Sequence, residues 1–180
     1  FTDIVLAGIM LVICLGVFLG IAILIKLGGV VRPEDRGPIL RREYRFSRGK
    51  SFMFCKFRFV KQQVLDKPGP VRNVGLSKQL ERDENCTLVG RRLKRWYLDE
   101  LPQLYNILRG DMTWVGPRPY PIEDYEDDLK SGRVRKQVIR AGLTGLWQSH
   151  KGVWVGRSDV DMDNEYIEQC RTLSPARLWL

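Results

Sequence analysis

The sequence predicts a helix-rich, mixed α/β fold with one long hydrophobic helix at its N-terminus and one small β-hairpin. The first observation behind this prediction is a run of 22 uncharged, mostly aliphatic residues from Ile4 to Ile25. The second is that aromatic residues alternate with other residues in segments 38–45 and 51–59, on either side of a turn that contains glycine. The third is a set of short helical patterns, at 88–98, 101–108 and 161–171.

The hydrophobic segment is long enough to enter a membrane. A bilayer core of about 30 Å needs roughly 20 apolar residues as a helix, and in lipid a helix satisfies its own backbone amides. The run is too long for a signal-peptide core and lacks a basic leader, and its length disfavours a buried helix of a soluble protein. We therefore expect a membrane-embedded helix in residues 1–29, ended by Gly28-Gly29, and a separate domain in residues 30–180.

Glycines interrupt the hydrophobic segment. Gly8, Gly16 and Gly20 lie inside it, and Gly16 is close to its middle. Because glycine weakens a helix locally, a bend is permitted there. Length alone does not decide whether the helix crosses the bilayer or turns back.

The charge outside this segment is positive. The chain has 30 Lys and Arg against 21 Asp and Glu, which gives a net charge of +9. Basic residues cluster at 32–61 and 91–95, close in sequence to the apolar run. This pattern predicts a cytoplasmic position beside anionic lipid headgroups, and it would also attract phosphates. A basic face that is simply solvated is the alternative.

The thiols and the histidine do not predict a zinc site. The chain has a single histidine, His150, and its four cysteines show no paired spacing. We expect His150 in a surface loop and reduced, mostly buried thiols at Cys14, Cys55, Cys86 and Cys170.

The remaining segments predict surface structure and further helices. Residues 65–87 are polar and rich in Pro and Gly, which predicts a surface excursion with one short helix. Residues 123–128 are acidic and are followed by the basic segment 130–140. Ser174-Pro175 is a possible start of another helix.

Two adjacent carboxylates, Asp99 and Glu100, are the sharpest chemical feature. They precede the apolar stripe of residues 101–108, which predicts a short helix that ends near Gly110 and has Pro102 in its first turn. Because a helix N-terminus favours anions, Asp99 is a candidate nucleophile, and Glu100 a candidate metal ligand or proton carrier. Acids that only stabilise the first turn are the alternative.

A second candidate is the arginine in Gly116-Pro117-Arg118-Pro119. Pro117 and Pro119 fix φ on each side of Arg118. A guanidinium held in this way suits bidentate phosphate recognition. A rigid connector whose arginine faces water is the alternative.

Several blocks of residues, these two included, occur in one order along the chain. They are Lys56-Phe57-Arg58, residues 98–112 (LDELPQLYNILRGDM), residues 115–119 (VGPRP), residues 142–148 (GLTGLWQ), and Asp163 with Tyr166. Together they resemble the signature of the bacterial sugar transferases, the monotopic phosphoglycosyl transferases that act on polyprenyl phosphate. The resemblance covers nearly the whole chain, including the hydrophobic helix.

The resemblance implies a reaction in two transfers. Asp99 attacks the β-phosphate of a UDP-sugar and UMP leaves; polyprenyl (undecaprenyl) phosphate then takes the phosphosugar. Glu100 assists, and Mg²⁺ is implied, with Asp99 and Glu100 as its protein ligands. The cations that would offset phosphate charge are Lys56, Lys94, Arg95 and Arg118.

The resemblance also implies a place in the cell. It predicts a re-entrant helix in the bacterial inner (cytoplasmic) membrane, with amphipathic interfacial helices on a catalytic domain that faces the cytoplasm. Leu15-Gly16 stands where the family often has Ser-Pro, and Lys94 stands where an arginine is common. Anionic membrane lipid is an expected partner, and nucleic acid is not. The rival functions are a membrane-anchored glycosyltransferase of another class and a non-enzymatic basic membrane tether.

Overall fold

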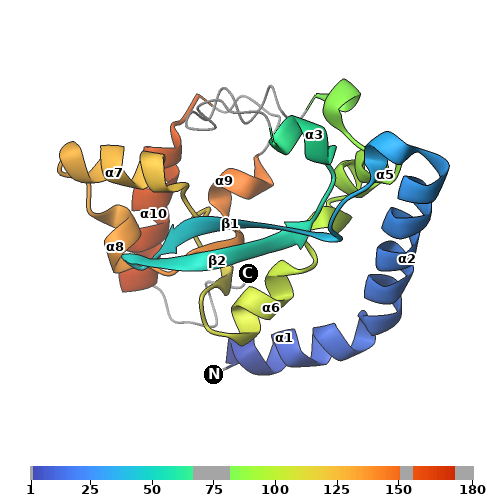
Figure 1. Cartoon of the computed structure of the whole chain (residues 1–180). Helices are drawn as coiled ribbons and strands as arrows, with labels where there is room; N and C mark the ends of the chain where they lie inside the picture. Colours follow the sequence, from blue (N-terminus) through green and yellow to red (C-terminus); the bar gives the residue numbers. More distant parts are fainter. Residues whose placement is uncertain (1, 67–81, 151–155, 173–180) are drawn as a thin grey trace. The chain divides into compact units, whose positions relative to one another are not determined.

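The computed structural model describes residues 2–66, 82–150 and 156–172 (Figure 1). Short 3₁₀ helices are labelled η. In chain order the elements are α1 (Thr2–Ile13), α2 (Leu15–Val31), η1 (Pro33–Asp35), β1 (Leu40–Ser47), β2 (Lys50–Phe57), α3 (Gln62–Leu65), η2 (Asp83–Asn85), α5 (Leu88–Arg95), η3 (Leu98–Glu100), α6 (Gln103–Leu108), β3 (Thr113–Val115), α7 (Ile122–Lys130), α8 (Arg135–Val138), β4 (Gly142–Thr144), α9 (Leu146–Ser149) and α10 (Asp159–Thr172).

The predicted helix-rich α/β fold with a small hairpin is confirmed. Strands β1 and β2 pair with each other, and the predicted helices at 88–98 and 161–171 correspond to α5 and α10. The sequence did not predict the second sheet, in which β3 and β4 pair in parallel with Thr113 opposite Gly142. Three-residue strands are too short to show an alternating pattern. The expected helix at Ser174-Pro175 lies outside the described residues, as do 67–81 of the polar excursion.

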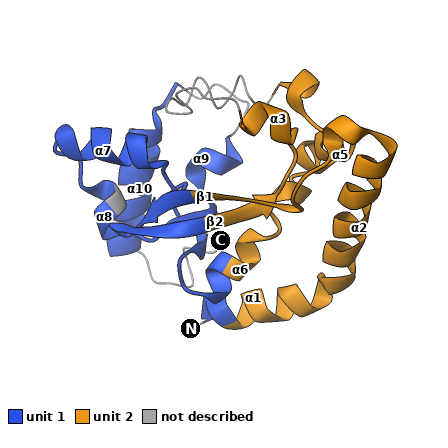
Figure 2. Cartoon of the chain, viewed as in Figure 1, with its two compact units in different colours: residues 1–4, 44–53, 106–180 blue, residues 5–43, 54–105 orange. Residues whose placement is uncertain are grey.

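The chain divides into two compact units (Figure 2). Unit 1 comprises residues 1–4, 44–53 and 106–180, and unit 2 comprises residues 5–43 and 54–105. Each strand of the hairpin contributes residues to both. The predicted division at residue 29, between a membrane element and a cytoplasmic domain, is of a different kind and stays a prediction.

An apolar cluster forms the core of unit 2. Ile21 and Ile25 of α2 pack with Phe57 of β2 and Leu93 of α5, and all four are buried. Partly buried side chains surround them: Phe18, Ile39, Leu40, Val89, Leu98 and Leu101. Each fully buried side chain of this size stabilises the folded state by roughly 1.5–3 kcal/mol. We call these residues the anchoring cluster. It fixes α2 to β2 and α5.

The hydrophobic helix bends where the sequence permits it. Helices α1 and α2 are separated at Cys14, next to Leu15-Gly16, and their axes differ by 58°. None of the described helices is long and apolar enough by itself to cross a membrane, whereas this bent pair passes the same test together. The bend is thus confirmed, and it occurs without a proline.

The prediction that Gly28-Gly29 ends the helix was wrong. Helix α2 continues through both glycines to Val31. A Cβ on Gly28 would lie 3.2 Å from Cγ2 of Val89, and one on Gly29 would lie 3.2 Å from Cα of Arg36. These glycines therefore serve close packing of α2 on α5 and η1, and this packing offsets their low helix propensity.

An ion network holds unit 1 together. Arg135 on α8 binds Asp128 on α7, with Nε 2.9 Å from Oδ2, and its Nη1 lies 3.2 Å from Oδ2 of Asp163 on α10. Its Nη2 donates to the Tyr120 hydroxyl (2.6 Å), which itself donates to Asp159. Asp163, a residue of the family resemblance, thus has a structural contact that joins three helices.

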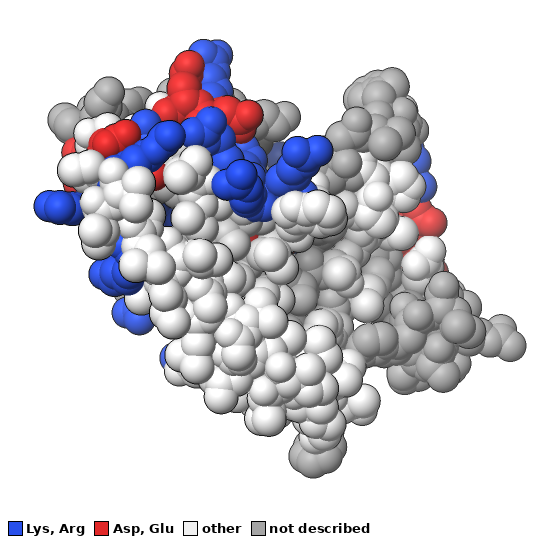
Figure 3. All heavy atoms as spheres, turned by 90° about the vertical axis from the view of Figure 1, so that its right-hand side faces the viewer, with Lys and Arg blue, Asp and Glu red and all other residues white. Residues whose placement is uncertain are grey.

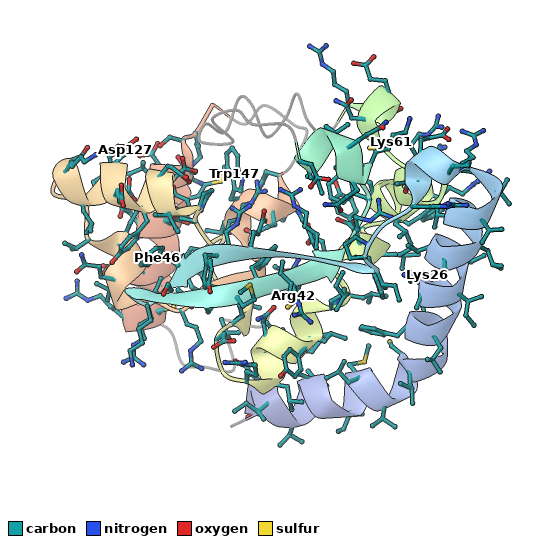
Figure 4. All side chains as sticks on the ribbon, in the orientation of Figure 1. Lys26, Arg42, Phe46, Lys61, Asp127 and Trp147 are labelled. Carbon is teal, nitrogen blue, oxygen red and sulfur yellow. The ribbon has the colours of Figure 1, made fainter. Side chains whose placement is uncertain are left out.

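Aromatic packing adds to this network in the same unit. The ring of Phe46, labelled in Figure 4, stacks on Tyr125 of α7 with centroids 4.0 Å apart. The Phe46 amide donates to the Tyr120 carbonyl over 2.9 Å. Strand β1 is therefore joined to the segment that leads into α7.

Replacing Arg135 should destabilise unit 1. Removing one partner of a buried ion pair typically costs about 3–5 kcal/mol, so we expect Arg135→Gln to lower the free energy of unfolding by about that amount. Arg133 also binds Asp128, but its side chain is 43% exposed, so Arg133→Gln should cost less than about 1 kcal/mol. Chemical unfolding in detergent micelles measures both, and equal losses would contradict this account of the network.

The same network should make the stability of the folded protein depend on pH. Burial raises the pKa of Asp128, but hydrogen bonds from Arg135 and Arg133 outweigh it and hold that pKa below its usual value. A carboxyl whose pKa is lowered by folding stabilises the native state above its unfolded pKa of about 3.9 and loses that effect as pH falls through the folded pKa. Unfolding midpoints measured from pH 6 downward should fall less steeply in Arg135→Gln than in the wild type.

Candidate active site

The carboxylate pair lies in a tight turn of its own. Helix α5 ends at Arg95, and Tyr97 adopts a left-handed conformation with φ of 55°. The Glu100 amide then donates to the Tyr97 carbonyl at 3.2 Å, which gives the 3₁₀ turn η3. The expectation that Asp99 and Glu100 stand at the start of the next helix, with Pro102 in its first turn, was wrong, because that helix begins at Gln103.

The helix after the pair is short. It starts at Gln103, one residue after Pro102, and ends at Leu108 before Gly110, which has φ of 79°. A six-residue helix has a small dipole, so the helix-terminus argument for an ionised Asp99 loses its basis. The end near Gly110 is as predicted.

Apolar neighbours fix the turn. Asp99 is 5% exposed and Glu100 is half-buried. Leu98 before the pair and Leu101 after it pack against the anchoring cluster. The burial of these two leucines therefore ties the position of the carboxylates to α2, the second half of the hydrophobic segment.

Two of the predicted cations meet at one aromatic ring. The Nζ atoms of Lys56 and Lys94 lie 5.1 Å and 5.8 Å from the ring centroid of Phe59. Lys56 is buried, and its Nζ is 4.0 Å from a carboxylate oxygen of Glu43, which also pairs with Arg41. One carboxylate, that of Glu43, thus lies within ion-pair distance of both Arg41 and Lys56.

Close backbone contact brings Lys94 to this place. The Thr87 amide donates to the Phe59 carbonyl at 2.8 Å, and the Thr87 hydroxyl caps α5 by accepting from the Gly90 amide at 2.8 Å. A Cβ on Gly90 would lie 2.2 Å from the Phe59 carbonyl oxygen. Glycine is therefore required where α5 crosses the end of the hairpin.

Arg58 has a structural role beside Lys56. It is 1% exposed and donates to three carbonyl oxygens, those of Asp35 (2.6 Å), Pro38 (2.7 Å) and Val60 (2.9 Å). Burial lowers its pKa, and the nearby Asp35 carboxylate opposes that shift. Arg58 thus ties the chain that follows α2 to the segment that carries Lys56.

The arginine turn is built in unit 1. Arg118 is exposed between two buried prolines, Pro117 and Pro119. The Gly142 amide donates to the Pro117 carbonyl at 2.9 Å, and a Cβ on Gly142 would lie 2.1 Å from the Gly116 nitrogen. Strand β4, which begins the block at 142–148, is therefore the direct support of this turn.

Five of the predicted site residues belong to the same compact unit. Asp99, Glu100, Lys56 and Lys94 all belong to unit 2. Arg95 belongs there too, but it is exposed and does not share the Phe59 ring with the lysines. Their chemical roles, and those of Arg118, Pro117 and Pro119 in unit 1, stay predictions.

Sequence reasoning missed Glu43, the ion-pair partner of Lys56, and Arg41, which pairs with the same carboxylate. Arg41 and Glu43 are two residues apart on one strand, and such residues share a face. Once the hairpin was recognised, that spacing could have indicated that Arg41 and Glu43 lie on one face of β1.

Within the described ranges, no group of three or more His, Cys, Asp or Glu side chains is arranged to hold a metal ion.

The expected burial of the thiols is confirmed for two of the four cysteines, and the surface position of His150 is confirmed. No disulfide joins cysteines of the described residues. Only Cys55 and Cys86 are buried, while Cys14 and Cys170 are partly exposed. His150 is exposed, with Nδ1 2.8 Å from the Leu146 carbonyl oxygen.

The sequence matches the model of one protein family, the bacterial sugar transferases, over residues 1–179. The chain belongs to this family. The undecaprenyl-phosphate galactose phosphotransferase of Salmonella typhimurium is 40% identical over 72% of this chain and 28% of its own length. The UDP-glucose:undecaprenyl-phosphate glucose-1-phosphate transferase of Escherichia coli K12 is 34% identical over 93% of this chain and 35% of its own.

A shorter relative is covered more fully. The exopolysaccharide production protein ExoY of Rhizobium meliloti is 34% identical over 92% of this chain and 75% of its own length. The bacterial sugar transferase chain described here thus spans about a third of the two phosphotransferases and three quarters of ExoY. The predicted family is confirmed.

Adding a methyl group to Gly90 should disturb the site. Because its Cβ would overlap the Phe59 backbone, we expect Gly90→Ala to lower the free energy of unfolding by about 1–3 kcal/mol. Gly20, also inside a helix, has no atom within 4 Å of an added Cβ, so Gly20→Ala should be neutral or stabilising by up to about 1 kcal/mol. Thermal unfolding in detergent compares the two, and a tolerated Gly90→Ala would argue against this contact.

Proposed function

We propose that this protein is a phosphoglycosyl transferase. It moves a sugar-1-phosphate from a UDP-sugar to undecaprenyl phosphate and thereby begins the assembly of a bacterial glycoconjugate. The observation that carries the proposal is the buried Asp99 turn, fixed to the hydrophobic helix in a chain of the sugar transferase family. The names of the relatives, which include undecaprenyl-phosphate sugar phosphotransferases, support the substrates.

In the first transfer, Asp99 is the nucleophile. A carboxylate oxygen of Asp99 forms a bond to the β-phosphorus of the donor, and the bond from that phosphorus to the oxygen bridging the two phosphates breaks. UMP leaves with the bridging oxygen and the bonding electrons, and the sugar phosphate stays on Asp99 as an acyl phosphate.

In the second transfer, undecaprenyl phosphate is the nucleophile. One of its phosphate oxygens bonds to the same phosphorus, and the Asp99 carboxylate leaves with its electron pair. The product is undecaprenyl diphosphate sugar, and the enzyme is restored. Two transfers at one carboxylate let a soluble donor and a membrane acceptor use the same site in turn.

The predicted cations are proposed to serve the phosphate charge. Lys56 and Lys94 lie together at Phe59, where they can stabilise charge that develops on the transferring phosphoryl group. Arg95 and Arg118 are proposed to bind phosphate oxygens, with Pro117 and Pro119 fixing the Arg118 backbone. Glu100 assists through a metal ion or by moving a proton.

A magnesium ion fits the donor set. Mg²⁺ is typically held by one or two carboxylates together with substrate phosphates, and Asp99 and Glu100 are adjacent carboxylates in one turn. We propose that these two residues hold it. When bound, the ion would neutralise charge on the donor phosphates.

The surface of unit 2 supports attachment to a membrane. The face presented by α1 and α2 is uncharged over most of its area, and charged side chains, both basic and acidic, gather at one end of it (Figure 3). Exposed bases of α2, η1 and α5 and their flanks are Lys26, Arg32, Arg36, Arg91, Arg92 and Arg95. Trp96 and Tyr97, also exposed, suit the bilayer interface. We propose that α1 and α2 enter the cytoplasmic leaflet of the inner membrane and return.

Removing the nucleophile should abolish the reaction. We expect Asp99→Asn to release no UMP from a panel of UDP-sugars supplied with Mg²⁺ and undecaprenyl phosphate, and to form no adduct with radiolabelled donor. Asp83 is an exposed aspartate in another 3₁₀ turn of unit 2, so Asp83→Asn is the matched control and should keep full activity.

The products separate this proposal from its rival. Release of UDP in place of UMP would mean transfer of sugar without its phosphate. An Asp99→Asn variant that still forms the radiolabelled adduct would remove Asp99 from the mechanism.

The re-entrant topology predicts that both ends of the helix pair face the cytoplasm. In a variant without native cysteines, Thr2→Cys and Lys26→Cys should react with a membrane-impermeant maleimide only from the cytoplasmic side. Both positions are exposed. Labelling from opposite sides would show a spanning helix.

A further inference from the structure

Unit 1 contains a pocket that the proposed chemistry does not use. Its volume is about 250 Å³. Arg48 from the hairpin turn and Arg140 before β4 line it, together with Thr113, Tyr166 and aliphatic side chains that include Val138. It thus combines two cations with an apolar wall.

Neither arginine is neutralised by a carboxylate of the described residues. Other arginines of unit 1 are ion-paired: Arg133 and Arg135 with Asp128, and Arg157 with Glu165. In the described ranges, Arg48 and Arg140 have no carboxylate oxygen within 4.0 Å. Two guanidinium groups on one pocket wall favour an anionic ligand, and phosphate above all, because of their planar donor geometry.

The other polar groups of the pocket leave this charge in place. The Tyr166 hydroxyl donates to the Val115 carbonyl at 2.7 Å. Burial and the neighbouring Cys170 raise the pKa of Tyr166, so the phenol carries no charge at neutral pH. Asp3 is the nearby acid; it accepts a hydrogen bond from the Thr113 hydroxyl. One carboxylate against two guanidiniums leaves the site positive.

Asp3 also places the pocket at the start of the hydrophobic segment. Its backbone carbonyl accepts from the Trp114 indole at 3.1 Å, so the first turn of α1 is bound to β3, which lines the pocket through Thr113. The apolar run begins at the next residue, Ile4. The pocket therefore lies where the chain would enter the bilayer.

The turn that carries Arg48 is specialised. Arg48 and Gly49 both have positive φ, 50° and 73°, a two-residue turn that favours Asn-Gly. For an arginine this left-handed conformation is strained. A Cβ on Gly49 would lie 3.7 Å from Cα of Gln137, so the turn is packed near α8. Arg48 thus keeps a strained backbone conformation in a turn that packs near α8.

We propose that this pocket binds the phosphate group of an anionic membrane phospholipid. The arginines bind the phosphate, and Val138, which is 61% exposed, lies against the apolar part of the lipid. The volume is below the roughly 300–1,000 Å³ of sites for drug-sized ligands, so it suits a headgroup better than a whole nucleotide-sugar. Basic pockets beside membrane segments bind such headgroups. The proposal rests on the proposed membrane attachment of α1.

The test uses the whole protein in neutral detergent micelles. Thermal unfolding is followed while phosphatidylglycerol, phosphatidylcholine, UDP or inorganic phosphate is added in separate titrations. Arg48→Asn with Arg140→Gln removes both guanidiniums, and asparagine suits the turn. Lys50→Gln with Lys130→Gln removes the same charge at exposed residues outside the pocket. Unfolding midpoints measured without lipid show whether each variant is folded. If Arg48→Asn with Arg140→Gln does not fold, Arg48→Lys with Arg140→Lys takes its place, because lysine lacks the planar guanidinium donors.

We expect phosphatidylglycerol to stabilise the wild type and the lysine control alike, and the arginine variant to bind it about tenfold more weakly or worse, since each lost charged hydrogen bond costs at least a factor of ten. Equal affinity of all three proteins would overturn the proposal. So would pocket-dependent stabilisation by UDP or inorganic phosphate without any by phosphatidylglycerol. This experiment measures lipid binding and not UMP release. Its outcome would therefore be the same if the proposed transferase activity were wrong.

Discussion

The burial of a few apolar side chains against α2 is the constraint on which the candidate site depends. Ile21 and Ile25 belong to the segment that is hydrophobic enough for a membrane, yet they are buried against Phe57 and Leu93. Because Leu98 and Leu101 pack on the same cluster, the carboxylate turn between them has a fixed relation to the hydrophobic helix. The proposed function, with a donor from water and an acceptor from lipid, would need this kind of fixed relation.

The two units are stabilised in different ways. Unit 2 relies on apolar burial and on a backbone contact at Gly90 that excludes any side chain. Unit 1 relies on the buried ion network of Arg135 and on the close approach of Gly116 and Gly142. Family blocks that first suggested catalysis therefore include structural residues: Asp163 holds helices together, and Gly142 supports the turn that carries Arg118.

Much of the fold was predictable from local pattern. The hairpin follows from alternating aromatic residues around Arg48-Gly49, and the helices α5 and α10 follow from their periodicity. The helix end at Gly28-Gly29 was predicted wrongly, because glycine that serves close packing looks the same in sequence as glycine that ends a helix. The β3–β4 pairing joins residues about 30 positions apart, and no local pattern reports such a contact.

By itself the sequence determined the family, the hydrophobic segment and the carboxylate pair, because each is recognised from short runs of contiguous residues. Tertiary structure alone decided that Asp99 is buried, that Lys56 and Lys94 share one ring, and that Arg48 and Arg140 share a pocket. The physical reason is that burial and charge proximity depend on which distant segments pack together. That choice is made by the sum of many contacts across the chain, and it cannot be read from the residues next to each position.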